Sequence, residues 1–134
     1  MKAVVPQKVA SRVDSIPFEV IDPEIRHLIS LMNRFPGIVT TNSCAGHGPG
    51  EPCYVSFRAD SQQDVRRFVA ALPVWGCRAG FRGNKGWSQH VSVYIAANPE
   101  EYILQIEGNP LHMQRELIGD VERALQSAVT AHPS

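Results

Sequence analysis

The fold class is decided by two strand-like runs and the turn between them: Trp75-Gly-Cys-Arg-Ala-Gly-Phe81, Gly83-Asn-Lys-Gly86 and Trp87-Ser-Gln-His-Val-Ser-Val-Tyr-Ile-Ala96. Polar and apolar residues alternate along the second run, which is typical of a strand with one wet face. A short turn rich in Gly and Asn joins antiparallel neighbours. The sequence therefore predicts a β-hairpin, and with it an antiparallel sheet.

Three amphipathic helices and three further strands are predicted around this hairpin. The strands are expected at 38–41, 53–58 and 102–107, and the last of these competes with a helical reading. Asp22 and Ser61 are expected to cap the first two helices at their N-termini. The three helices are predicted from apolar stripes at helical spacing: Ile25, Leu28, Ile29 and Met32; Val65, Phe68, Val69 and Leu72; Leu117, Ile118, Val121, Leu125 and Val129.

This order of elements mixes helices with strands and contains no long βαβ series. It predicts an α+β fold, with a mixed, largely antiparallel sheet and about three helices packed on it. At 134 residues the chain fits one domain, expected to span 1–134. Residues 1–20 are expected to form an ordered tail or an edge strand.

The chain carries 13 Lys+Arg and 13 Asp+Glu, so its formal net charge is zero and a general affinity for polyanions is not expected. The charges are nevertheless segregated along the sequence. Between 65 and 99 there is no acidic residue, and between 100 and 123 there are six. This arrangement is compatible with a local anion-facing surface. The five cations of the first stretch are Arg66, Arg67, Arg78, Arg82 and Lys85.

Cellular location and the state of the cysteines are predicted from the apolar runs. No run approaches the length needed to cross a bilayer, and the N-terminus lacks the apolar core of a signal peptide. We therefore expect a cytoplasmic protein without membrane contact, in which Cys44, Cys53 and Cys77 are reduced thiols. A Cys44–Cys53 bridge would require an oxidising compartment. Cys77 lies in an apolar setting and is expected to be buried.

Chemically useful side chains are densest in the run from Thr40 to His47, Thr40-Thr-Asn-Ser-Cys-Ala-Gly-His47. Three Gly and two Pro between Asn42 and Pro52 predict that this part of the chain is an irregular loop. Glycine backbone and short polar side chains suit a pocket for an anion. The predicted pocket has Cys44 and His47 at its centre as the catalytic candidates. Its predicted ligand-binding residues are Thr41, Asn42, Ser43 and Gly46.

Three chemical interpretations of this loop remain open. Cys44 is a nucleophile activated by His47 in the first. In the second, zinc is bound by Cys44, His47 and Cys53, completed by Cys77 or His90. In the third, which we favour, no metal is bound and the loop supplies shape and hydrogen bonds to a small anionic ligand or to RNA.

The predicted hairpin interleaves cations with aromatic residues, a composition that suits a phosphate backbone with stackable bases. Arg82 and His90 are expected to approach the loop pocket from this hairpin. The alternative is an ordinary exposed hairpin, whose cations are solvated and whose aromatic rings pack inward. The residues concerned are Arg78, Phe81, Arg82, Asn84, Lys85, Trp87 and His90.

The run from Phe35 to His47, Phe35-Pro-Gly-Ile-Val-Thr-Thr-Asn-Ser-Cys-Ala-Gly-His47, resembles the signature of the tRNA wybutosine-synthesis methyltransferase family, the third enzyme of that pathway. Small uncharacterised bacterial and phage proteins with an S-C-x-G-H loop look similar. His47 stands where the family has Arg, and Asn42 where it has Ser. The matching positions are Thr40, Thr41, Ser43, Cys44 and Gly46.

This resemblance implies a mixed α/β domain whose loop faces S-adenosylmethionine or tRNA. The functional prediction is a tRNA-modification-like enzyme with a pocket for a nucleotide or an RNA segment at this loop. The alternative is a zinc-stabilised or purely structural interaction module without catalysis. The oligomeric state is left open.

Overall fold

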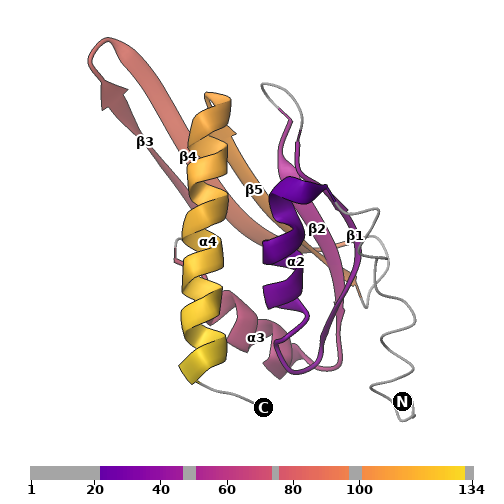
Figure 1. Cartoon of the computed structure of the whole chain (residues 1–134). Helices are drawn as coiled ribbons and strands as arrows, with labels where there is room; N and C mark the ends of the chain where they lie inside the picture. The colour runs from indigo at the N-terminus through magenta and orange to yellow at the C-terminus, as the bar shows by residue number, and fades with distance from the viewer. Residues whose placement is uncertain (1–21, 47–50, 74–75, 97–100, 132–134) are drawn as a thin grey trace.

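The computed structural model describes residues 22–46, 51–73, 76–96 and 101–131, and these form one five-stranded sheet with helices against one face (Figure 1). The helical elements are η2 (Pro23–Ile25), α2 (Arg26–Met32), α3 (Gln62–Ala71) and α4 (Leu111–Ala131). The strands are β1 (Ile38–Cys44), β2 (Cys53–Ala59), β3 (Gly76–Arg82), β4 (Lys85–Ile95) and β5 (Glu101–Asn109). Residues 1–20, predicted as a tail or an edge strand, lie outside the described residues.

The strand order is β1-β2-β5-β4-β3, and every neighbouring pair is antiparallel. The predicted hairpin is present as β3 and β4, joined at Gly83 and Asn84. The ambiguous run at 102–107 is a strand, β5, in the middle of the sheet. The α+β class with an antiparallel sheet is therefore confirmed.

Strand β1 is longer than the sequence predicts. It was expected at 38–41 with a loop from Asn42, yet Asn42, Ser43 and Cys44 pair with β2. A register irregularity between Thr40 and Asn42 absorbs the mismatch, as a bulge does. The prediction of an irregular loop is wrong for these three residues, because the Gly and Pro residues that break the strand begin only at Gly46.

The first helix begins as a 3₁₀ turn and continues as α2, with its predicted apolar residues Ile25, Leu28, Ile29 and Met32 all buried. The Asp22 carboxylate makes no capping hydrogen bond, contrary to the prediction. It accepts a hydrogen bond from the Ala45 backbone N–H at 3.0 Å, and so joins the start of this helix to the end of β1.

The core lies between the sheet and the helices. Helices α2 and α4 lie side by side across the sheet, and α3 packs near its lower end (Figure 1). The Phe68 ring of α3 meets Phe35 and Phe57 edge to face, with centroids 5.6 and 5.3 Å apart. The rest of the predicted α3 stripe is only half-buried, because α3 covers a corner of the sheet. The Ser61 hydroxyl accepts from the Asp64 N–H at 3.2 Å, so the predicted cap of α3 is confirmed.

The two faces of the sheet differ sharply. Residues such as Val55, Phe57 and Leu104 face the helices and are buried. The alternate positions point the other way, to a face on which no helix of the described ranges lies (Figure 1). We call it the open face. By register it carries Asn42, Cys44, Tyr54, Ser56, Cys77, His90, Ser92, Tyr94, Gln105 and Glu107.

Candidate functional site

The end of β1 is held in place by one buried glutamine. Gln114 of α4 accepts a hydrogen bond at Oε1 from the Gly108 N–H at 3.0 Å. Its Nε2 donates to the carbonyl oxygens of Glu51 at 3.0 Å and Ala45 at 3.4 Å. A single side chain thus bridges both arms of the chain reversal between β1 and β2 and the end of β5.

Asp22 fixes the same point from the other side, because its Oδ2 accepts from the Ala45 N–H. An anionic ligand would bind through N–H groups of this kind. The Ala45 N–H already donates to a carboxylate, so it does not serve such a ligand. Anion binding by the predicted loop would have to use other donors.

Gly46 is required for the backbone to pass Glu51. Its φ is +80°, in the left-handed region. A Cβ built at Gly46 would lie 2.4 Å from the Glu51 carbonyl oxygen and 2.7 Å from Gln114 Nε2. Gly46 was predicted to shape a pocket, and the structure gives a physical reason for glycine at this position. No side chain fits where the chain leaving β1 passes the chain entering β2. Whether it contacts a ligand stays a prediction.

The predicted site residues of β1 divide between the faces of the sheet. Asn42 and Cys44 lie opposite Ser56 and Tyr54 and face the open side. Ser43 lies opposite the buried Val55 and so faces the helices, while Thr41 sits at the bulge. Asn42 is exposed and Cys44 is partly exposed. His47 lies outside the described residues, so the predicted pairing of Cys44 with His47 stays a prediction.

Arg82 and His90 are not brought together. His90 points to the open face, where its Nδ1 lies 3.9 Å from Glu107 Oε1. Arg82 points to the helix side, where its guanidinium lies 5.9 Å from the Trp87 ring centroid and 3.9 Å from the Glu116 carboxylate of α4. Cys44 and His90 are three strand spacings apart, about 14 Å. Arg82 and His90 therefore do not line one small pocket together with Cys44.

The geometry also disfavours the zinc interpretation. Cys53 is fully buried on the core side of β2, and burial is the main cause that raises the pKa of its thiol from 9.0 to about 12. Cys44 lies on the opposite face of the sheet, and all three cysteines are free thiols. Among the residues that the structure describes, no three His, Cys, Asp or Glu side chains are grouped so as to hold a metal ion.

Cys77 was expected to be buried, and that prediction is wrong. Strand β3 is an edge strand whose outer side has no neighbour in the sheet, so an apolar sequence there does not imply a core position. The Cys77 residue is exposed.

The charge segregation of the sequence is partly offset by ion pairs between the two stretches in the fold. Arg78 Nε donates to Gln89 Oε1 at 2.7 Å, and its Nη2 lies 3.3 Å from Asp120 Oδ2 on α4. With the Arg82–Glu116 pair, two cations of the basic stretch face two acids of the acidic stretch. Gln89 is itself buried and donates to the Met113 carbonyl at 2.8 Å.

Sequence reasoning missed Gln114 and Gln89 and gave Asp22 only a capping role, yet these three residues join the elements at this end of the sheet. One signal was present for Gln114. It lies three residues before Leu117, on the apolar stripe of the last helix, where a polar side chain is expected to be buried and fully hydrogen-bonded. Asp22 and Gln89 carry no such local signal, because their partners come from distant elements.

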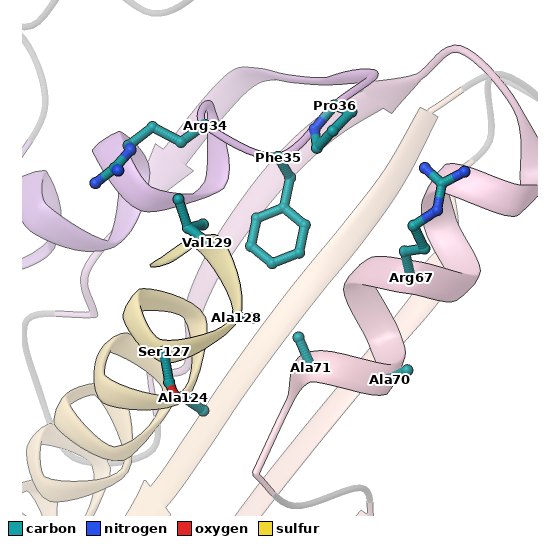
Figure 2. Close-up of a pocket in the computed structure, with 10 residues that line it drawn as sticks. All are labelled: Arg34, Phe35, Pro36, Arg67, Ala70, Ala71, Ala124, Ser127, Ala128 and Val129. Atoms are coloured by element: carbon teal, nitrogen blue, oxygen red, sulfur yellow. The ribbon is translucent and has the colours of Figure 1, made fainter. Parts of the chain in front are cut away.

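A cavity that the sequence did not predict lies at the other end of the helical layer (Figure 2). It has a volume of about 750 Å³ between the end of α2, α3 and the C-terminal half of α4. The Phe35 ring points into it, whereas the Arg34 guanidinium points away (Figure 2). Its lining is otherwise dominated by alanines, so it offers shape without reactive groups. The cavity is lined by Arg34, Phe35, Pro36, Arg67, Ala70, Ala71, Ala124, Ser127, Ala128 and Val129.

The segment from Thr41 to Gly46 is thus a strand end fixed by Asp22 and Gln114, with Asn42 and Cys44 on the open face. A family model matches here. The model described as Methyltransferase TYW3 matches residues 2–47. This is about a third of the chain, and it ends just after Gly46. The resemblance of the chain to the wybutosine-synthesis family is supported over these residues.

The chain matches no curated protein and no solved structure significantly. In the described ranges, none of the helices combines the length and the apolar character that a membrane crossing demands.

Proposed function

We propose that this protein is a tRNA-modification-like enzyme that binds a nucleotide or an RNA segment where β1 ends, from Thr41 to Gly46. The observation that carries the proposal is the match to the Methyltransferase TYW3 family model, which spans this segment and ends at His47. The rest of the chain supplies the sheet that holds the segment.

The composition of the open face supports RNA as the ligand. Single-stranded RNA is bound by aromatic rings that stack on bases and by side chains that hydrogen-bond to base edges. Tyr54 lies directly opposite Cys44, and Gln105 lies opposite Tyr54 on β5. Tyr94 is 45% exposed and donates from its hydroxyl to Gln105 Oε1 at 3.0 Å. A row of groups suited to RNA therefore crosses the sheet from Cys44.

In this proposal Cys44 has the reacting position, because its thiol is partly exposed on that face, and His47 is its proton partner. Asn42 contributes an exposed amide, whose Oδ1 already accepts from the Ser43 N–H at 2.9 Å. Thr41 contributes a hydroxyl group from the bulge, whereas Ser43 faces the helices and so lies away from a ligand on the open face. Gly46 lets the chain reverse beside them.

S-adenosylmethionine is implied by the resemblance, and its carboxylate would need free donors. In the described part of the segment the Ala45 N–H donates to Asp22 and the Ser43 N–H donates to Asn42 Oδ1, so neither serves that carboxylate. The carboxylate of S-adenosylmethionine would therefore have to use other donors, and no step of the proposal is assigned to the cofactor.

The experiment compares tRNA binding and tRNA modification by the wild-type protein, Cys44→Ser and Cys77→Ser. Cys77 is the matched control, because it is an exposed thiol on the same face at the far edge of the sheet. We expect wild type and Cys77→Ser to bind bulk tRNA and to change its nucleoside mass spectrum when S-adenosylmethionine is supplied. Cys44→Ser should bind tRNA without changing the spectrum.

The alternative, a zinc-stabilised or structural interaction module, predicts different results. The purified protein would then contain stoichiometric zinc that Cys44→Ser loses, or it would leave tRNA both unbound and unmodified. Either outcome would overturn the proposed function.

A further inference from the structure

The tip of the β3–β4 hairpin extends past the helices (Figure 1), and its Arg82 lies 3.9 Å from Glu116 of α4. Phe81 stands near this tip and is 79% exposed. A phenylalanine as exposed as this gains little from the hydrophobic effect in the free protein. Its ring is therefore available to a partner.

Beside the Phe81 ring, the open face of the hairpin has a depression of about 450 Å³. That volume falls within the range of about 300–1,000 Å³ that ligand sites occupy. Its lining includes the small residues Ala79, Gly80 and Gly86 and the polar residues Ser88 and Asn109. The lining residues are Ala79, Gly80, Phe81, Gly86, Trp87, Ser88 and Asn109.

Two glycines make room for the aromatic rings of the hairpin. A Cβ built at Gly86 would lie 3.5 Å from the Phe81 ring, and one built at Gly80 would lie 3.0 Å from the Trp87 ring. Each ring thus lies across a glycine of the neighbouring strand. The outer side of Phe81 remains open for another flat ring to stack against.

Charge distinguishes RNA from an apolar peptide as the occupant. Arg82 and Lys85 face each other across the turn, and both are exposed. Lys85 makes no ion pair within the described ranges. The Arg82–Glu116 pair has a separation of 3.9 Å with side chains 63% and 50% exposed, and such a pair is weak enough to yield to a phosphate. Both cations point to the helix side of the tip and Phe81 to the open face, so an RNA strand that stacks a base on Phe81 would pass its phosphates around the tip to reach them.

We infer that Phe81 is the stacking platform for an unpaired base of the RNA, with Ser88 and Asn109 placed to hydrogen-bond to the base edge. This inference rests on the proposed function, because it takes RNA as the substrate. Cys44 lies four strand spacings from β3, about 19 Å away. Phe81 therefore holds the RNA at a distance from Cys44 and does not touch the reacting atoms.

The test measures the affinity of bulk tRNA for the wild-type protein and for Phe81→Ala, Phe81→Trp and Ile95→Ala. We expect Phe81→Ala to bind about 5- to 150-fold more weakly, which is the loss of one base–aromatic stack. Phe81→Trp should keep wild-type affinity, because the ring is retained. Ile95→Ala is the matched control, since Ile95 is 66% exposed on β4 but lies away from the tip, and it should leave affinity unchanged.

The outcomes separate this inference from the proposed function. If wild type binds tRNA and Phe81→Ala binds it equally well, the inference is overturned and the proposed function stands. If wild type does not bind tRNA, both are overturned. If Phe81→Ala lowers the molecular mass in solution and leaves tRNA affinity intact, the platform binds a second copy of the chain, which also overturns the inference. Phe81 is exposed, so each variant should keep the wild-type melting temperature.

Discussion

The end of β1 and the tip of the β3–β4 hairpin both carry predicted site residues, yet the fold uses them in opposite ways. At the β1 end the backbone is engaged within the protein, by Asp22 at the Ala45 N–H and by Gln114 at the Ala45 and Glu51 carbonyls. At the hairpin tip, in contrast, the side chains of Phe81 and Lys85 are exposed to solvent. The backbone at the β1 end is thus held by hydrogen bonds within the protein, whereas side chains at the hairpin tip are exposed and can contact a partner.

The sharpest test of this contrast substitutes a left-handed glycine in each region. Gly46→Ala places a Cβ 2.4 Å from a backbone oxygen, whereas Gly83, with φ +63°, has nothing within 4 Å of an added Cβ. We expect Gly46→Ala to lower the free energy of unfolding by about 3 kcal/mol and Gly83→Ala by about 1 kcal/mol. Urea denaturation measures both, and equal losses would contradict the contrast.

The next largest effect is expected at Gln114, whose side chain bridges Ala45, Glu51 and Gly108. Gln114→Leu leaves the Gly108 N–H and two carbonyl oxygens without their partner in a buried place. We expect a loss of about 2–3 kcal/mol, since each unpaired buried group is costly. Gln126→Ala is the control on the same helix. Gln126 bonds only to Thr130 in an exposed pair, so its loss should stay below about 0.5 kcal/mol.

A pH series tests the burial of Cys53 beneath the β1 end. The pKa of this thiol is raised to about 12 in the folded protein, above its ordinary 9.0. Its contribution to stability is therefore complete below pH 9 and is lost as the pH rises toward 12. By pH 10 we expect a loss of about 1 kcal/mol. Cys53→Val should flatten this part of the profile, and Cys77→Ser should leave it unchanged. A wild-type profile level up to pH 12 would show that Cys53 is not buried.

The smallest effect is expected at the hairpin. Arg82→Gln removes an exposed ion pair, worth less than about 0.5 kcal/mol. Arg78→Gln should cost about 1 kcal/mol, because Arg78 also donates to the buried Gln89. Thermal unfolding of the two variants measures the difference. A larger loss of stability from Arg82→Gln than from Arg78→Gln would mean that the tip contributes to the stability of the fold.

Periodic elements were predictable from sequence, and partnerships between distant elements were not. The hairpin and the stripe from Leu117 to Val129 follow from local alternation and helical spacing, and both are present. The extension of β1 to Cys44 depends on a bulge and on a partner strand. The ion pair of Arg78 with Asp120 joins residues that no local pattern connects.

The candidate site was predictable as a choice of residues but not as one pocket. Cys44 and Asn42 do share a face of the sheet, because they are two apart on one strand. Arg82 and His90 were expected beside them, but strand order places both on the far side of β5, and side-chain alternation turns them to opposite faces. Strand order and bulges arise from tertiary packing, and local sequence patterns do not predict them.

We propose that RNA crosses the open face of the sheet, from the hairpin tip to the end of β1. The most direct measurement is ultraviolet cross-linking of bound tRNA, with the attached peptides identified by mass spectrometry. We predict cross-links in two peptides, one containing Phe81 and one containing Cys44 or Tyr54. Cross-links confined to α2 and α4, on the opposite side of the sheet, would contradict the claim.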